Sequence, residues 1–202
     1  FAMGEESANT IDIFDEDYLA RLEKIKLPNT KIELLKQLLA KALNELKKTN
    51  QHKAIEFSKK FRSLVDLYNE RKEEDAFTSE VHHEAVDSFL ELMEQLKQEM
   101  GSFEELGITV EEKAFYDILK AVAVKYQFPY EEERLIKLAS AVKAVVDDKA
   151  KYPDWNNRQD IKAALRVELI MLLSKNGYPP VTHAEVYQCV FEQAENFKHH
   201  RL

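Results

Sequence analysis

The sequence predicts an all-α protein, a multi-helix bundle that begins with a helical hairpin and contains no sheet. Apolar residues recur at steps of three and four along most of the 202 residues, which is the period of one helix face. The chain holds only four glycines and five prolines, too few for the turns of a many-stranded sandwich or barrel, and for a glycine-rich phosphate loop. Apolar residues make up 45%, enough to bury a core without disulfides or metals.

The predicted hairpin consists of two helices separated by Thr49-Asn50-Gln51. Thr30 and Glu33 form a predicted capping box at the first helix start, because each side chain can satisfy a backbone N–H there. The first helix has an apolar stripe formed by Ile32, Leu35, Leu39, Ala42 and Leu46. The second has a stripe formed by Phe57, Phe61, Leu64 and Tyr68. Each stripe is narrow and needs a partner, so we expect the two helices to fold back antiparallel.

Two further helices follow, each with a polar residue at its start. Thr78 and Ser79 open a helix that is expected to stop near Gly101. Its stripe is formed by Ala85, Phe89, Leu92 and Leu96. Thr109 caps the next helix, which Pro129 ends. The inward face of that helix holds Phe115, Ile118 or Leu119, and Val122.

Three helices are expected in the remainder of the chain. The first has a stripe formed by Leu135, Leu138, Val142 and Val145. The second, at about 158–175, contains the apolar segment 166–174 and ends at Asn176-Gly177, so we expect it to be the most buried helix. The last has a predicted capping box of Thr182 and Glu185. Its stripe is formed by Tyr187, Val190, Ala194 and Phe197.

The sequence also predicts how the chain is divided into domains. We expect residues 1–12 to be a tag remnant and flexible lead, because the opening FAMG is typical of tag cleavage. Residues 13–100 would form the hairpin and an acidic helix, and 101–202 a compact bundle, with 13–202 as one continuous helical domain of a longer protein. The single cysteine excludes an internal disulfide and a cysteine-based zinc site. Without a long apolar run or a secretory signal, the expected location is cytoplasmic.

Charge is distributed unevenly along the chain. Residues 31–62 carry nine Lys/Arg against three Asp/Glu, whereas residues 63–112 carry three against fifteen. A basic hairpin beside an acidic helix can complement it, or can contact an anionic partner such as DNA. The possible anion contacts are Lys47, Lys48, Lys53, Lys59, Lys60 and Arg62. An ordinary solvated helix face is the favoured alternative, because the whole chain has a formal charge of −8.

One spacing imitates the carboxylate and lysine pattern of metal-dependent nucleases. It consists of Pro153-Asp154 followed by Asp160 and Lys162. In those nucleases the residues project from adjacent strands, whereas Asp160 and Lys162 lie two apart on a predicted helix and face different directions. We therefore interpret the acidic residues as favourable groups at a helix N-terminus.

Histidine, cysteine and aromatic residues offer weaker signals. Glu80 and His83 have the spacing of a di-iron half-site, and the metal-binding bundle that this implies would need a second copy. No second copy occurs at the remaining histidines His52, His183, His199 and His200, so His82 and His83 are expected to be a solvated pair. Cys189 is expected to be a buried, inert thiol rather than a nucleophile. Tyr152 and Trp155 would serve either as a stacking platform or as the packing of a loop onto the core.

Two stretches carry a resemblance to a known family. GITVEEKAFYDIL at 107–119 and YPDWNNRQDIKAALRVELIMLLSKNGYPP at 152–180 resemble the C-terminal helical region of the R subunit of type I restriction enzymes. The basic and helical stretch at 31–75 fits the same region in the same order, so the resemblance covers about residues 13–198. It implies a parent subunit with an N-terminal nuclease domain and a two-lobed, ATP-dependent DNA translocase. None of the catalytic motifs of that family has a counterpart in this chain.

The resemblance implies a non-catalytic assembly domain that attaches the translocase and nuclease to the methyltransferase and specificity subunits. No catalytic, cofactor-binding or metal-binding residue is assigned to this chain, and ATP and Mg²⁺ are implied for the parent alone. The expected partners are those subunits, the remainder of the R subunit, and DNA through the complex, with no membrane. The competing hypothesis is a DNA-contacting module that uses the basic hairpin at 31–62.

Overall fold

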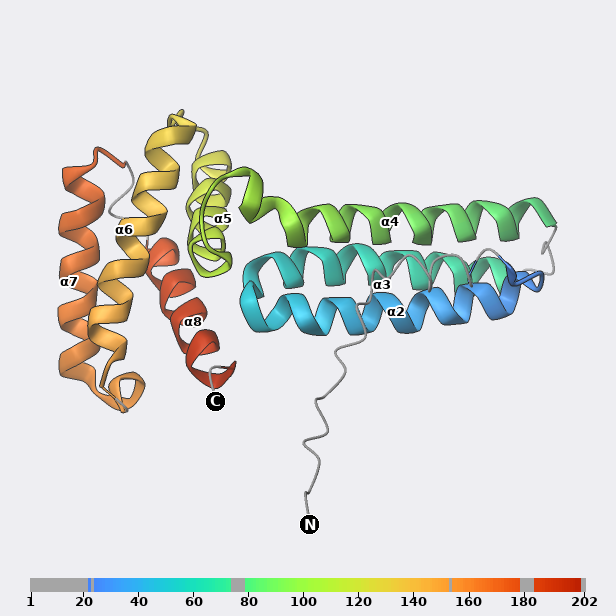
Figure 1. Ribbon diagram of the computed structural model, residues 1–202, viewed down its shortest axis with the longest axis horizontal. Coiled ribbons are helices and arrows are strands. Elements are labelled where there is room, and N and C mark those ends of the chain that lie inside the picture. The colour runs from blue at the N-terminus through green and yellow to red at the C-terminus, as the bar shows by residue number, and fades with distance from the viewer. Residues whose placement is uncertain (1–21, 23, 74–78, 153, 179–183, 201–202) are drawn as a thin grey trace, which may run out of the picture. The chain divides into compact units, whose positions relative to one another are not determined.

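The computed structural model describes residues 22, 24–73, 79–152, 154–178 and 184–200. These residues form seven α-helices and one short 3₁₀-helix, with no strand among them, so the predicted all-α fold is confirmed (Figure 1). The expected lead at 1–12 and the capping residue Thr182 lie outside the described residues. None of the described helices combines the length and the apolar character that a membrane crossing requires.

The chain divides into two compact units. Unit 1 consists of the described residues within Phe1–Ala42 and Phe61–Lys97, and unit 2 of those within Leu43–Lys60 and Gln98–Leu202. The three helices α2 (Pro28–Thr49), α3 (Gln51–Glu73) and α4 (Ser79–Glu105) contribute residues to both units. Residues far apart in the sequence therefore build each core.

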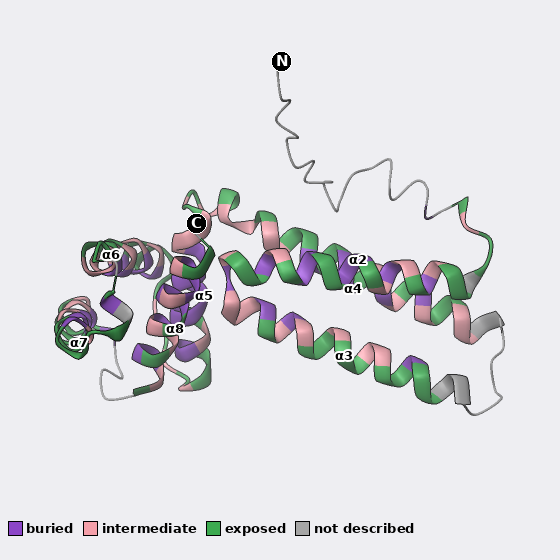
Figure 2. Cartoon of the chain, turned by 90° about the horizontal axis from the view of Figure 1, so that it is seen from below, coloured by how far each residue is buried: buried purple, intermediate pink, exposed green. Residues whose placement is uncertain are grey.

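Unit 1 is a three-helix arrangement around aromatic and aliphatic side chains, with buried residues on the facing sides of the helices (Figure 2). Phe89 of α4 is buried, and the rings of Phe61 and Tyr68 on α3 meet it edge to face at centroid distances of 6.3 and 6.4 Å. The predicted stripe of α2 is buried here at Ile32, Leu35, Leu39 and Ala42. The stripe of α3 thus packs on α4, and the Tyr68 hydroxyl of α3 donates to Asn29 of α2 at 3.2 Å.

Two predicted helix ends differ from the structure. Helix α2 begins at Pro28, so Thr30 lies inside the first turn and Glu33 pairs with Lys36 instead of capping. Proline at the first helical position has its φ already set and lacks an N–H that would otherwise be unpaired, which explains the earlier start. Helix α4 continues past Gly101 to Glu105.

The structure ends α4 with a left-handed turn at Gly107. Gly107 has a φ of 65°, its N–H donates to the Glu104 carbonyl, and the N–H of Ile108 donates to the Phe103 carbonyl. These two bonds form a Schellman motif, in which glycine at the left-handed position carries no Cβ penalty. Gly101 has no such role and behaves as an ordinary helical residue.

Unit 2 contains four more helices, α5 (Val110–Lys125), α6 (Glu132–Ala150), α7 (Gln159–Lys175) and α8 (Ala184–His200), and the 3₁₀-helix η1 (Trp155–Asn157). Helix α6 packs against α5 and α7, and α8 packs against α5 and α6 (Figure 1). All four apolar residues expected on the inner face of α5, including both Ile118 and Leu119, are buried. In α6 the core position is Val146, and Val145 is only partly buried.

Helix α5 is the most buried helix of unit 2. The prediction that the helix at 158–175 is the most buried one is wrong. Nine of the 16 residues of α5 are buried, against four of the 17 residues of α7. The buried residues of α7 are Ile161, Leu165, Leu169 and Leu173. They follow an i, i+4 spacing, which defines a single face, so the other apolar residues of α7 lie elsewhere on the helix.

Candidate functional site

A buried ionic cluster lies among the polar side chains of unit 2. Lys113 Nζ lies 2.6 Å from Glu99 Oε1, and 2.6 and 2.7 Å from the two carboxylate oxygens of Asp117. Asn50 donates from Nδ2 to Asp117 Oδ2 at 2.6 Å. Lys113 and Asp117 are four residues apart on α5, which places them on one helix face, and they are only 7% and 4% exposed. The two opposite charges therefore compensate each other away from water.

Lys53 extends this cluster toward the surface. Its Nζ lies 3.1 Å from Glu56 Oε2 and 3.7 Å from Glu99 Oε2. Burial lowers the pKa of the Lys53 ammonium, but Glu99 and Glu56 outweigh it, so the pKa is raised above its usual value. Burial raises the pKa of the Asp117 carboxyl, and the opposing charge of Lys113 offsets this only in part.

Helix α8 holds the turn between α2 and α3 with two amide side chains. Gln193 accepts from the N–H of Gln51 at 3.0 Å and donates to the Thr49 carbonyl at 3.1 Å. Asn196 donates from Nδ2 to the carbonyls of Lys47 and Lys48, at 2.8 and 3.1 Å. These bonds satisfy carbonyls at the end of α2 and an N–H at the start of α3, which have no partner within their own helices.

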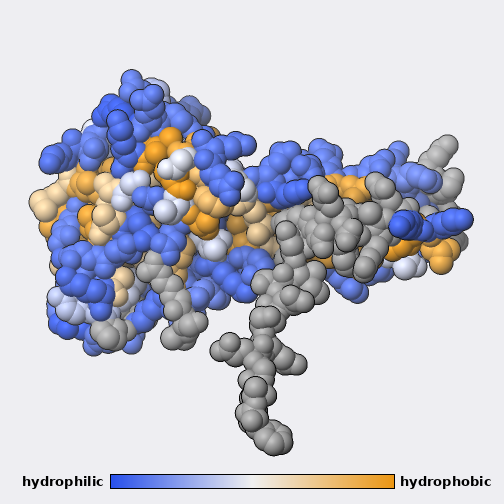
Figure 3. Space-filling model, in the orientation of Figure 1, coloured by the Kyte–Doolittle hydropathy of each residue, from blue (hydrophilic) through white to orange (hydrophobic). Residues whose placement is uncertain are grey.

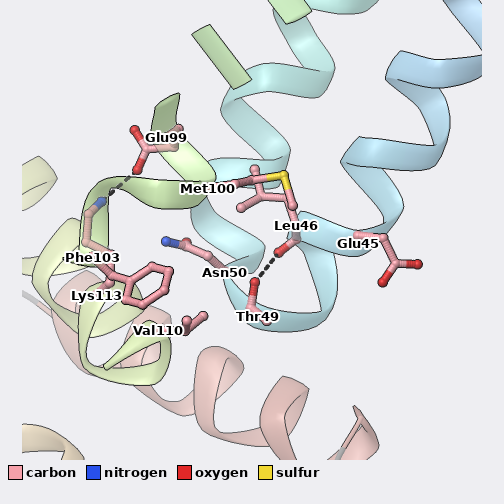
Figure 4. A pocket seen from close by; sticks show the side chains of 9 residues that line it. All are labelled: Glu45, Leu46, Thr49, Asn50, Glu99, Met100, Phe103, Val110 and Lys113. Carbon is pink, nitrogen blue, oxygen red and sulfur yellow. Dashed lines mark hydrogen bonds and ion pairs between the residues drawn. The ribbon is translucent and has the colours of Figure 1, made fainter. Parts of the chain in front are cut away.

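A pocket of about 240 Å³ opens beside the ionic cluster (Figure 4). Figure 4 shows Glu99 and Lys113 joined on one side of it and Thr49 bonded to the Leu46 carbonyl on the other. Its apolar lining comes from Leu46, Met100, Phe103 and Val110. The pocket lies entirely within unit 2, between the ends of α2 and α4 and the start of α5.

The donors and acceptors around this pocket are paired with one another. The three N–H donors of Lys113 face three carboxylate oxygens, and Asn50 Oδ1 accepts from the backbone N–H of Lys53 at 3.1 Å. Within the part of the chain that the structure describes, no group of three or more His, Cys, Asp or Glu residues could hold a metal ion. The arrangement fixes the α2–α3 turn, α4 and α5 against one another.

The six basic residues predicted as anion contacts are Lys47, Lys48, Lys53, Lys59, Lys60 and Arg62. The structure places the five lysines in unit 2 and Arg62 in unit 1. Lys48 pairs with Glu45 at 2.7 Å and Lys60 with Glu56 at 3.5 Å, besides the pairs of Lys53. Glutamates thus compensate three of these lysines, which reduces the positive charge that the hairpin presents.

The residues of the nuclease-like spacing do not converge. Asp160 binds the Arg158 guanidinium at 2.6 Å, and Lys162 pairs with Glu195 of α8 at 3.1 Å. Asp154 is exposed, and Pro153 lies outside the described residues. Asp160 lies in the first turn of α7, as the interpretation of a helix N-terminus required.

The predicted histidine, cysteine and aromatic residues occupy separate places. Burial lowers the pKa of His52, and burial raises the pKa of the Cys189 thiol, which is half-buried rather than fully buried. Trp155 is completely buried, so it packs its loop onto the core, while Tyr152 is exposed.

His82 Nε2 lies 2.9 Å from Asn29 Oδ1 in unit 1. His183 and the side chain of Glu80 lie outside the described part of the chain, and His199 and His200 are exposed at the end of α8.

Helix α7 carries a second apolar face that is exposed. Val167 is 53% exposed, Ile170 36% and Met171 59%. At 100° per residue these positions, with the exposed Ala163 and Ala164, fall within an arc of about 120° opposite the buried face. We name this set the α7 outer face. Hydrophobic residues reach the surface over α6 and α7 (Figure 3).

Sequence reasoning missed the ionic cluster and the outer face. The i, i+4 spacing of Lys113 and Asp117 was visible, but it is equally typical of an exposed pair. Gln193 and Asn196 contact residues more than 140 positions away, which no local pattern indicates. The apolar composition of α7 was visible, but composition does not distinguish one broad buried face from two opposite ones.

The chain is similar to a family of restriction enzyme subunits. The family model described as "Type I restriction enzyme HindI endonuclease subunit-like, C-terminal" matches residues 1–200. A putative type I restriction enzyme MjaIXP endonuclease subunit of Methanocaldococcus jannaschii is 21% identical over 198 residues, which cover 97% of this chain and 18% of the relative. The type I restriction enzyme HindI endonuclease subunit of Haemophilus influenzae is 22% identical over 195 residues, 96% of this chain and 18% of the relative. The chain thus spans less than a fifth of the curated relatives, and no solved structure matches it.

Proposed function

We propose that this chain, which belongs to the HindI endonuclease subunit-like C-terminal family of type I restriction enzymes, is a non-catalytic assembly domain. It attaches the ATP- and Mg²⁺-dependent DNA translocase and nuclease of its parent subunit to the methyltransferase and specificity subunits. DNA reaches it through that complex. Its own contribution is a protein docking surface.

The α7 outer face is the observation that carries this proposal. It places three large apolar side chains, Val167, Ile170 and Met171, on the surface next to two exposed alanines. Contiguous exposed apolar side chains are typical of protein interaction sites, since their burial provides most of the free energy of association. Because the opposite face of α7 already packs into the core of unit 2, the helix can present the outer face without losing its own support.

The chemistry of this face favours a protein over DNA as the partner. None of its five residues is charged, and the charged residue on the same side of α7, Asp160, is acidic, whereas DNA binding depends on Lys and Arg that neutralise phosphates. The lysines of the basic hairpin are partly compensated by glutamates. The paired ionic cluster of unit 2 likewise suits a structural role better than a catalytic one.

The test measures binding of the chain to the purified methyltransferase–specificity complex of the same restriction system. The double variant Val167→Ser with Met171→Ser should bind at least about tenfold more weakly, because two anchors of the interface lose their apolar area. The control is Val124→Ser, an even more exposed valine on α5 outside the outer face, which should change the affinity less than about twofold. Binding should change little with salt.

The DNA hypothesis makes the opposite forecast. Binding to duplex DNA would fall steeply with salt, and joint neutralisation of Lys47, Lys48, Lys53, Lys59, Lys60 and Arg62 would abolish it. Tight, salt-sensitive DNA binding together with no affinity for the methyltransferase complex would overturn the assembly proposal.

A second assay tests the non-catalytic part of the proposal. With Mg²⁺, ATP and plasmid DNA, the purified chain should neither hydrolyse ATP nor cut the DNA, because the translocase and nuclease motifs of the family have no counterpart in its sequence. Asp160 and Lys162, which imitate a nuclease spacing, are engaged in separate ion pairs. DNA cleavage that disappears on Asp160→Ala would show that this residue belongs to an active site after all.

A further inference from the structure

A second, smaller cavity lies in unit 1. It has a volume of about 110 Å³ and is lined by Ile25, Lys26, Lys31, His82, His83 and Val86. All six residues belong to unit 1, so the cavity does not depend on the placement of unit 2. It is separate from the ionic cluster, from the α7 outer face and from the six basic residues considered above.

The polar lining of this cavity consists of basic residues. It consists of two lysines and two histidines, with no acidic residue among the six. An ammonium group offers only donors, and a neutral imidazole offers one N–H donor. The remaining lining, Ile25 and the buried Val86, is apolar and reduces the access of water to one side of the cavity. Such surroundings strengthen the attraction of the half-buried Lys31 for an anion, and the exposed Lys26 adds a second ammonium group.

Local structure holds the cavity in place. His82 Nε2 lies 2.9 Å from Asn29 Oδ1, which also accepts from the Tyr68 hydroxyl at 3.2 Å. A carbonyl oxygen only accepts, so Nε2 carries a proton and the ring of His82 is oriented by α2. Helix α2 starts beside the cavity without an acidic residue in its first turn, so no carboxylate of its own compensates Lys31 there.

We propose that this cavity, lined by Lys26, Lys31, His82 and His83, is a binding site for a phosphate-type oxyanion. The cavity, at about 110 Å³, is too small for a drug-sized molecule, because sites for such molecules occupy about 300 to 1,000 Å³. A single phosphate group enters, while a base and sugar attached to it remain outside. The ligand is therefore either free phosphate or a phosphate group presented by a larger molecule. This site goes beyond the proposed assembly function and does not rest on it.

The experiment titrates the 202-residue chain with inorganic phosphate at low ionic strength, by calorimetry and by the amide chemical shifts of α2 and α4. The double variant Lys26→Met with Lys31→Met should raise the Kd for phosphate at least about tenfold, because both ammonium groups are lost. The double variant to Arg keeps both charges and should stay within about threefold. The control is Lys41→Met, which removes an exposed charge about 15 Å further along α2 and should change the Kd less than about twofold.

Two further titrations identify the source of the phosphate group. If the same double Met variant weakens binding of a short DNA duplex, the phosphodiester backbone is the ligand. If it weakens binding of ATP instead, a nucleotide is the ligand, and if only inorganic phosphate is affected, the free ion is. Each of these results supports the site. Phosphate that binds equally well to the double Met variant, or that is weakened as much by Lys41→Met, overturns it.

Discussion

Lys113 and Asp117 lie one turn apart on α5 and form a buried ion pair, with Nζ 2.6 Å from Oδ1. Removing one partner leaves the other, almost fully buried charge without its ionic partner. Lys113→Met should therefore lower the free energy of unfolding by about 3 to 5 kcal/mol, measured by urea denaturation. Lys48→Met breaks the exposed pair with Glu45 and should change it little. Equal effects of the two substitutions would contradict the buried character of the pair.

The start of α5 is fixed by a capping box between Thr109 and Glu112. Glu112 N donates to Thr109 Oγ1 at 3.2 Å, and Thr109 N donates to Glu112 Oε2 at 2.8 Å. Thr109→Ala should lower the free energy of unfolding by about 1 kcal/mol at pH 7. Glu112→Gln should show a similar loss, because the amide accepts the Thr109 N–H bond more weakly than the carboxylate does.

The free energy of unfolding that Glu112→Gln loses should decrease as the pH falls. The backbone N–H of Thr109 holds the pKa of Glu112 below its usual value, which favours the ionised form in the folded state. This stabilisation is present above the ordinary glutamate pKa of about 4.3 and is lost as the pH falls through the lower folded pKa. The difference between wild type and Glu112→Gln should therefore shrink between about pH 5 and pH 3. A difference that grows over this range would contradict the assignment.

Gln127 occupies a left-handed position that glycine would fill with less strain. Its φ is 55°, and α5 ends there with Gln127 N donating to the Val124 carbonyl and Phe128 N to the Ala123 carbonyl. Gln127→Gly should raise the free energy of unfolding by about 0.5 to 1 kcal/mol, since relief of the Cβ penalty exceeds the entropy cost of glycine. Gln127→Ala keeps the Cβ and should give no such gain in thermal denaturation.

The two faces of α7 should respond differently to truncation. Leu169 is buried, so Leu169→Ala should cost about 2 to 5 kcal/mol through lost apolar burial and the cavity left behind. Met171→Ala removes a side chain from the outer face and should cost less than about 0.5 kcal/mol. A loss below about 1 kcal/mol for Leu169→Ala would mean that the face opposite to the outer one is not the buried one.

Local patterns in the sequence were sufficient for the helices and for most of the core. The three-and-four spacing of Ile32, Leu35 and Leu39 identified a buried stripe, because a helix that is apolar on one face must bury that face. The same reasoning fails for α7, whose apolar composition predicts a central helix although only one of its faces is buried. Periodicity is informative only when polar residues mark the opposite face, and α7 has few of them between Ile161 and Leu173.

The polar sites depend on tertiary structure and were beyond local patterns. Lys113 and Asp117 are buried because Asn50, from the α2–α3 turn, and Glu99, from α4, pair with them. The basic lining of the unit 1 cavity likewise joins Lys26 and Lys31 to a histidine pair that the sequence indicated only as solvated. Pairing of this kind appears only once the helices are placed in space.

Because amide side chains of α8 cap the α2–α3 turn, unit 2 can be completed only after α8 has been synthesised, whereas unit 1 can fold earlier. Unit 1 needs no residue beyond Lys97, so its helices can pack while the rest of the chain is still in the ribosome. The α2–α3 turn is made early, but Gln193 and Asn196, which cap it, emerge more than 140 residues later. Contacts of such high sequence separation form slowly, so unit 2 is the part most exposed to misfolding and to proteases until α8 has been synthesised.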